Sequence, residues 1–333
     1  MASQQGRDGY ARAKELLLGA KRILVSGHLS PDGDSLGSMI ALSRFMRGIG
    51  KDAVAAADLN ALGKLSFLEG VGDIVPLKKL RRQKFDLLFV VDCSSAARLP
   101  PELRPFAEKL PKICIDHHAT SDGAFAEAAI IDPAASSAGE IVWRFAKWME
   151  WKLDAVSAEA LWVSILTDTG RFAYDSTKLG TMRAAGDLLR HGVRTALIAD
   201  IIYGTFSRKA IELKRIAWRS LHIWKNRKVA EVSLTRDDFR SVRGTKADAE
   251  DVIEIPRSVA RNEIALFFYQ IPDRTKETRC SIRTRGDWDA TALAAKFGGG
   301  GHVKAAGCTI EASMNAAKRK MRAAVKEMLK NAK

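Results

Sequence analysis

Cysteine is scarce in this sequence of 333 residues, which contains only four. Cys93, Cys114, Cys280 and Cys308 are far apart, and no C-x-x-C pair occurs. This spacing excludes a sequence-local zinc knuckle and gives no sign of a disulfide scaffold, because both need closely spaced cysteines. We therefore expect buried thiols without special chemistry.

Long apolar runs are missing as well. No stretch is long enough to span a bilayer, and the N-terminal segment MASQQGRDGYARAKEL lacks the apolar core of a signal peptide. The sequence also lacks an RNA-recognition aromatic motif, a zinc finger and a low-complexity tail. We expect a soluble, cytoplasmic protein that binds no membrane and meets its ligand in a cleft.

Acidic residues are outnumbered, with 39 Asp and Glu against 54 Lys and Arg, so the net charge is +15. Such an excess indicates an anionic partner. Part of the positive charge lies near the C-terminus, on one face of an expected amphipathic helix. Exposure of this face to solvent accounts for the charge there, so we assign these residues no contact with a ligand. The chain is 47% hydrophobic, enough for a sizeable core, and its length favours two domains.

Apolar runs alternate with helical stretches over residues 1–192, and this alternation predicts a doubly wound parallel sheet of the α/β class. Strands are expected at 22–25, 53–57, 85–91, 112–115 and 129–131, and helices at 10–20, 36–48, 137–149, 157–167 and 178–191. Residues 193–225 are expected to form a helical linker. A smaller α/β domain, 226–333, should follow, with strands at 229–234, 263–270 and 278–284 and helices at 247–261, 289–296 and 313–329.

Acidic residues and histidines follow three of the expected strands and end one expected helix. They are His28, Asp32 and Asp34 after the first strand, Asp92, the run Asp116-His117-His118, and Asp168. Because the carboxyl ends of parallel strands share one edge, these side chains should meet there. Each alone is explained by a turn or a helix cap. Together they indicate a site for Mn²⁺, Mg²⁺ or a similar divalent ion.

A run of glycines, GGGGH, marks the second domain. Consecutive glycines have a high entropic cost, so a special backbone is needed there, and their amides can form an anion-binding nest. Ser281 and Arg283 alternate on an expected strand and so share a face, where a guanidinium suits phosphate. The alternatives are a flexible hinge and a surface arginine. The candidate substrate-binding residues are Ser281, Arg283, Gly299, Gly300, Gly301 and His302.

These motifs resemble those of the DHH phosphoesterase superfamily, in the subgroup with a C-terminal DHHA1 domain. The resemblance rests on Asp116-His117-His118, the H-x-x-x-D-x-D opening at His28, the isolated Asp92, T-D-T-G around Asp168 and the GGGGH run. It covers nearly the whole chain. The short two-domain form is similar to the NrnA-like oligoribonuclease and pAp phosphatase group. RecJ-like relatives carry an extra oligonucleotide-binding module, for which this chain has no room.

The resemblance implies a phosphoester hydrolase with two divalent ions, Mn²⁺ being preferred and Mg²⁺ or Co²⁺ being alternatives. One ion would be held by His28, Asp32 and Asp92, and the other by Asp34, Asp92, His117 and Asp168. Such a pair can activate a water and stabilise charge on phosphorus. His118 would contact the scissile phosphate or protonate the leaving oxygen. Asp116 would orient a ligand histidine.

The resemblance also implies the substrates, which are RNAs of two to five residues, pAp converted to AMP, and linear or cyclic dinucleotides. The second domain would hold them, with Arg257 or Arg261 as a further arginine, and the family expectation is a homodimer. Two alternatives remain open. One is a RecJ-like exonuclease on single-stranded DNA. The other is a catalytically silent nucleotide-binding sensor, which would normally show an eroded ligand set.

Overall fold

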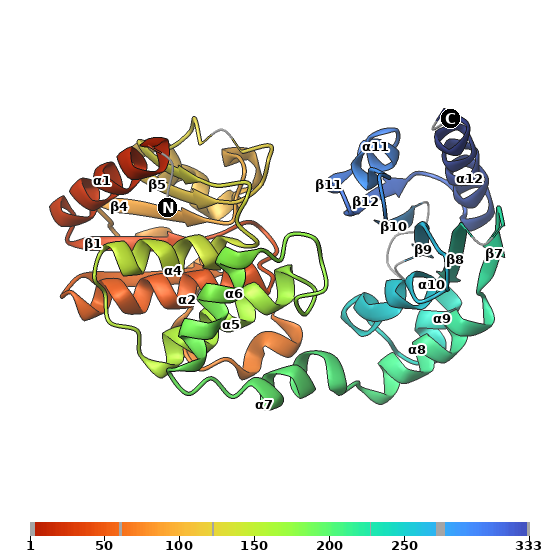
Figure 1. Ribbon diagram of the computed structural model, residues 1–333, viewed down its shortest axis with the longest axis horizontal. Helices are drawn as coiled ribbons and strands as arrows, with labels where there is room; N and C mark the ends of the chain where they lie inside the picture. The colour runs from red at the N-terminus through yellow and green to blue at the C-terminus, as the bar shows by residue number, and fades with distance from the viewer. Residues whose placement is uncertain (1–3, 60–61, 122, 227, 271–276, 332–333) are drawn as a thin grey trace. The chain divides into compact units, whose positions relative to one another are not determined.

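A computed structural model of the chain describes residues 4–59, 62–121, 123–226, 228–270 and 277–331. The chain divides into two compact units, Met1–Ile202 and Tyr203–Lys333 (Figure 1). The boundary falls inside the segment expected as a linker. The predicted α/β class is confirmed, because each unit is a sheet covered by helices. No described helix is both long and apolar enough to cross a membrane.

The first unit is built on a parallel sheet of six strands in the order β3-β2-β1-β4-β5-β6. Its strands are β1 (Arg22–Ser26), β2 (Asp52–Ala57), β3 (Val75–Pro76), β4 (Leu87–Val91), β5 (Lys112–Asp116) and β6 (Ala128–Ile131). All five residues of β4 are buried, as expected for a parallel strand covered on both faces. Only the two-residue β3 was not predicted.

Helices cover one face of this sheet, where α2 packs against α4, α5, β1 and β2 (Figure 1). The helices of the unit are α1 (Gln4–Gly19), α2 (Gly33–Gly48), α3 (Arg104–Lys109), α4 (Ala138–Trp148), α5 (Ala155–Asp168), α6 (Leu179–Leu189) and α7 (Thr195–Ala199). In α2, 13 of 16 residues are buried. On the other face, α3 and short turns pack Leu77, Leu80 and Leu103 against Leu88 and Val90.

The second unit contains a mixed sheet in the order β11-β12-β10-β9-β8-β7, in which only the β8/β9 pair is parallel. Its strands are β7 (His222–Trp224), β8 (Val229–Leu234), β9 (Ile264–Tyr269), β10 (Thr278–Thr284), β11 (Gly300–His302) and β12 (Ala305–Ile310). Its helices are α8 (Arg208–Arg219), α9 (Arg236–Ser241), α10 (Glu254–Arg257), α11 (Ala290–Ala295) and α12 (Met314–Asn331). Each face of the sheet carries its own hydrophobic core.

Several features of this unit differ from the sequence-based expectation, including helix α9, which was not predicted. Strand β7 lies where only helix was expected, and the pair β11 and β12 was not predicted, because A-A-G-C-T-I has few residues that favour strands. The helix expected at 247–261 is a 3₁₀ helix, Ala247–Ile253, followed by the single turn of α10. Pro256 has no amide hydrogen, which disfavours a longer helix here.

Candidate functional site

Parallel register brings the predicted acidic residues to one edge of the first sheet. Val91 pairs with Ile115, so the next residues, Asp92 and Asp116, are neighbours at the carboxyl ends of β4 and β5. The amide of Asp92 donates to the carbonyl of Ile115 at 2.9 Å. Asp92 has a φ of +52°, a left-handed conformation that turns its side chain at the strand end. It is 2% exposed.

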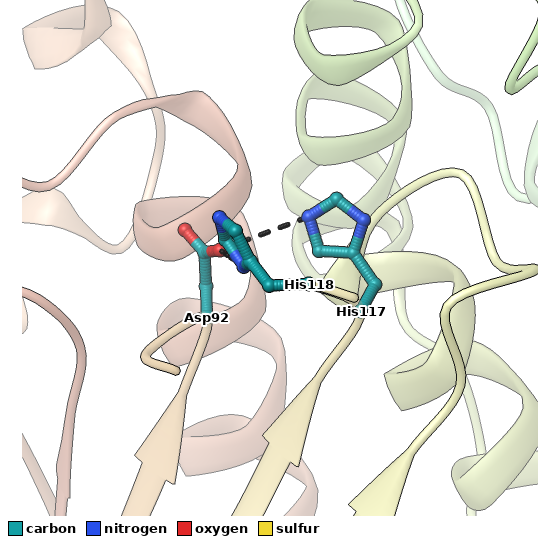
Figure 2. A group of neighbouring side chains, drawn as sticks. All are labelled: Asp92, His117 and His118. Atoms are coloured by element: carbon teal, nitrogen blue, oxygen red, sulfur yellow. Dashed lines mark ion pairs between the residues drawn. The ribbon is translucent and has the colours of Figure 1, made fainter. Parts of the chain in front are cut away.

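Three groups of side chains at this edge could each hold a metal ion, because their ligand atoms lie within 4.8 Å of one another. They are His28 with Asp32 and Asp92, Asp34 with His117 and Asp168, and Asp92 with His117 and His118 (Figure 2). The first two contain residues from the two predicted ligand sets. The Nε2 atom of His117 lies 3.4 Å from Asp168 Oδ2 and 3.6 Å from Asp34 Oδ2.

Asp32 serves as the N-cap of α2 as well as facing His28. Its Oδ1 accepts from the amides of Asp34 and Ser35, both at 3.0 Å, whereas its Oδ2 lies 3.8 Å from His28 Nε2. The Asp32 side chain is 60% exposed, and the nearby imidazole of His28 together with the amides of Ser35 and Asp34 lowers the pKa of Asp32. Burial opposes the charge of His28, but Asp32 and Asp92 raise the pKa of His28 to about 10. Asp32 can therefore cap α2 and serve as a proposed metal ligand at the same time.

Asp34 is held by the N-terminus of α4, a contact that the sequence did not reveal. Its carboxylate accepts from the amide of Ala138 at 2.7 Å, from that of Gly139 at 3.0 Å and from Ser164 Oγ at 2.5 Å. A helix N-terminus stabilises negative charge, so it helps to keep this buried carboxylate ready for a cation. Only the capping pattern S-x-x-E at Ser137 signalled where α4 begins.

Crowding of carboxylates makes this edge electrostatically suited to a divalent cation. Burial, followed by the charges of Asp32 and Asp34, raises the pKa of Asp92 to about 8. Burial and the charge of Asp34 likewise raise the pKa of Asp168 well above its usual value. Bound cations reverse such shifts, and carboxylate oxygens with imidazole nitrogens suit Mn²⁺ or Mg²⁺. The residues present therefore fit the predicted ions.

Asp116 contacts a different histidine from the one expected. Its Oδ1 lies 2.7 Å from Nδ1 of His118, whereas to His117, the expected ligand, it accepts only the backbone amide at 2.9 Å. Burial alone would lower the pKa of His118, but the hydrogen bond with Asp116 and its charge raise it. The structure thus pairs Asp116 with His118, the proposed proton donor, which also belongs to one of the three groups that could hold a metal ion.

The predicted substrate-binding residues lie in the second unit. Ser281 and Gly299 line a pocket of about 300 Å³, together with Arg279, Tyr269 and Phe297, which the sequence analysis did not single out. Arg279 shares a face of β10 with Ser281 and Arg283, so the alternation of the strand could have identified it.

The glycine run begins in a turn, where Gly298 has a φ of +69°, and becomes extended only from Gly300. Gly300 pairs with Gly307 and Gly301 with Ala306, which places both glycines in β11 at the edge of the sheet. Gly301 has a φ of +144°, a conformation that favours glycine. The backbone of His302 also belongs to β11, and its side chain lies outside the described part of the chain.

Two family models match the chain. Residues 22–171 match the model described as "DHH family, N-terminal domain", and residues 240–331 match that of the "DHHA1 domain". The bifunctional oligoribonuclease and PAP phosphatase NrnA of Thermus thermophilus is 29% identical over 297 residues, which are 87% of this chain and 84% of that protein. That relative bears the name of a phosphoester hydrolase, the class of enzyme predicted from the sequence.

Two solved structures share the fold. An exopolyphosphatase-related protein from Bacteroides fragilis has a TM-score of 0.88 at 24% identity, over 96% of each chain. The exonuclease RecJ bound to manganese has a TM-score of 0.52 at 17% identity, over 98% of this chain and 95% of that one. At these identities the likeness concerns the fold alone.

Proposed function

Because the chain belongs to the DHH family and carries a DHHA1 domain, we propose that it hydrolyses phosphoester bonds in short nucleotides. The substrates would be RNAs of two to five residues, pAp, and linear or cyclic dinucleotides. The observation that carries this proposal is the convergence of carboxylates and imidazoles from three strands and α5 at one edge of the sheet. The NrnA relative supports the substrate class.

In this proposal the ligand sets are those of the sequence analysis, with Asp92 common to both. Their geometry supports the assignment, since His28 Nε2 lies 3.3 Å from Asp92 Oδ2 and His117 Nε2 lies 3.8 Å from Asp92 Oδ1. When bound, two divalent ions would supply an activated water and positive charge beside the attacked phosphate. Mn²⁺ is the preferred ion.

His118 is the proposed general acid. Asp116 faces its Nδ1, so the carboxylate keeps the ring protonated and orients it, and Nε2 would deliver the proton to the leaving sugar oxygen. Asp116 is fully buried, which shields its carboxylate from water, while the His118 side chain is 13% exposed. The assignment gives Asp116 a positioning role.

The residues proposed to hold the rest of the nucleotide are Ser281, Arg283, Gly299, Gly300, Gly301 and His302. The pocket at Ser281 and Gly299 supports this role, because it offers a hydroxyl, exposed backbone and the neighbouring guanidinium of Arg279. A guanidinium can bind phosphate through two parallel hydrogen bonds. Arg279 joins Arg257 and Arg261 as a candidate for the further arginine, because it lines this pocket, whereas Arg257 pairs with Glu254 at 3.0 Å.

The test is product release from pAp, a 5′-phosphorylated RNA dinucleotide and cyclic di-AMP, each with Mn²⁺ and with EDTA. We expect turnover of the dinucleotide or pAp that EDTA abolishes. Absence of turnover with all three would overturn the proposal. Processive degradation of long single-stranded DNA would then favour a RecJ-like exonuclease, and metal-independent nucleotide binding without turnover would favour a sensor.

A further inference from the structure

The second unit brings together two cysteines that are 28 positions apart in the sequence. Cys280 of β10 and Cys308 of β12 occupy directly opposite positions in an antiparallel pair of strands. The thiol of Cys280 donates to the carbonyl of Ser281 at 3.7 Å, and each thiol shifts the pKa of the other. Both side chains lie on the same face of the sheet, in the hydrophobic core with Ile282 and Ile310. All four cysteines are free and buried, as expected, but the sequence did not reveal that these two are neighbours.

The strand register places the two cysteines at a distance that a disulfide can bridge. The amide of Thr284 donates to the carbonyl of Lys304 at 3.1 Å, and hydrogen-bonded pairs recur at every second position, so Cys280 and Cys308 form such a pair. Opposite Cα atoms in these pairs are about 5.5 Å apart, which lies within the range of about 4.4–6.8 Å for disulfides. Opposite Cβ atoms in such pairs are about 5.5 Å apart, whereas a disulfide needs about 3.5–4.5 Å, so the bond requires a local approach of the two strands.

A small oxidant can approach the pair through the pocket of about 300 Å³, which both cysteines line. Gly298, Gly299 and Gly307 also line it and have no side chains to obstruct it. Cys308 is 7% exposed, whereas Cys280 is 1% exposed. The interaction with Cys280 lowers the pKa of Cys308 despite burial, while burial raises the pKa of Cys280 well above its usual value. Cys308 is therefore the better nucleophile of the two.

We propose that Cys280 and Cys308 form a reversible cross-strand disulfide when a peroxide enters this pocket. The thiolate of Cys308 attacks one peroxide oxygen, the O–O bond breaks, and with hydrogen peroxide the departing hydroxide takes up a proton to give water. Cys280 then attacks the resulting sulfenic acid, and the S–S bond forms as a second water leaves. The two thiols lose two electrons and the peroxide gains them.

The disulfide would lie directly beneath the glycine run. A methyl group built on Gly299 would meet the Cβ of Cys308 at 2.6 Å and would clash with the carbonyl of Gly307. The backbone of Gly299 is therefore in close contact with Cys308. Oxidation would link β10 covalently to β12 at this point and restrict the movement of the two strands where they line the pocket. This inference goes beyond the proposed hydrolysis and does not depend on it.

The test is thiol mapping of the full chain after treatment with hydrogen peroxide. The reduced protein is oxidised, then denatured, alkylated and digested for mass spectrometry. We expect one peptide pair joined through Cys280 and Cys308, two thiols fewer per chain, and full recovery with dithiothreitol. Cys93 and Cys114 serve as internal controls and should remain alkylated, since they lie in the first unit and do not face each other across a ladder.

Two matched variants sharpen the test. In C280A the sulfenic acid on Cys308 has no partner, so dimedone should label Cys308, whereas C93A should form the disulfide like the wild type. Recovery of both Cys280 and Cys308 as free thiols in the oxidised wild type would overturn the proposal. A disulfide between chains, or irreversible oxidation of Cys308 alone, would also overturn it. Because the wild-type mapping is decisive by itself, poor folding of C280A would not obscure the result.

Discussion

Three features of Asp92 are unfavourable for the stability of the fold. It is buried, it adopts a left-handed backbone, and it lies close to further carboxylates. Strained backbones and perturbed carboxyl groups concentrate at functional sites, because folding alone would not retain them. A bound cation would compensate for the charge at this position, so the residue makes sense as a ligand shared by two ions.

Replacing Asp92 by asparagine should stabilise the metal-free protein. Asparagine tolerates the left-handed conformation and carries no charge, so we expect D92N to gain on the order of 1 kcal/mol in unfolding free energy in EDTA. With a folded pKa of about 8, wild-type Asp92 binds more protons in the folded state, and its contribution to stability falls as pH rises from the unfolded value toward 8. Urea unfolding at pH 5 and pH 8 should show a larger gain at pH 8.

In the proposed mechanism Asp116 acts through His118, and D116N should separate the effect of its charge from that of its hydrogen bond. Asparagine can still accept from Nδ1, but the pKa of His118 should fall because the carboxylate that raises it is gone. Since the proposed acid works protonated, the alkaline limb of the kcat profile should move to lower pH, with kcat reduced about 10- to 100-fold near pH 8. An unshifted profile with unchanged kcat would contradict the positioning role.

At the scale of elements, strands with strong apolar runs and the residues that follow them could be predicted from the sequence. The apolar run that forms β4 predicted this strand from the sequence. Because parallel strands have their carboxyl ends at one edge of the sheet, Asp92 and Asp116 were then expected to lie close together. Contacts made through tertiary packing could not be predicted. The α4 N-terminus on Asp34 and the Ser164 hydroxyl both join segments more than a hundred positions apart. The weak strands β11 and β12 were also missed.

The edge strand β11 offers a matched pair of glycine substitutions. A side chain at Gly299 would clash with Gly307 and press on Cys308, whereas one at Gly300 would meet nothing within 4 Å. We expect G299A to destabilise the second unit by roughly 1–3 kcal/mol and to raise KM, and G300A to fold like the wild type. Denaturant unfolding and steady-state kinetics would check this. Equal stability of G299A and wild type would show that β11 does not pack as described.

At the scale of the whole molecule, the net charge of +15 favours encounter with phosphorylated substrates. Salt screens such attraction over about 10 Å at 0.1 M ionic strength. We therefore expect kcat/KM for pAp to fall several-fold between low and physiological salt, with kcat nearly constant. Kinetics in NaCl series at fixed Mn²⁺ would measure it. If kcat/KM stayed constant, the charge excess would have no part in substrate capture.

If the edge formed by β1, β4 and β5 is a metal-dependent phosphoesterase site, hydrolysis of pAp must depend both on the metal and on Asp92. Hydrolysis of pAp is followed for the wild type and D92N, each with saturating Mn²⁺ and with EDTA, after circular dichroism has shown equal folding. We predict turnover by the wild type only with Mn²⁺, and a loss of at least about 100-fold in D92N. Full activity of D92N with the metal supplied would contradict the account.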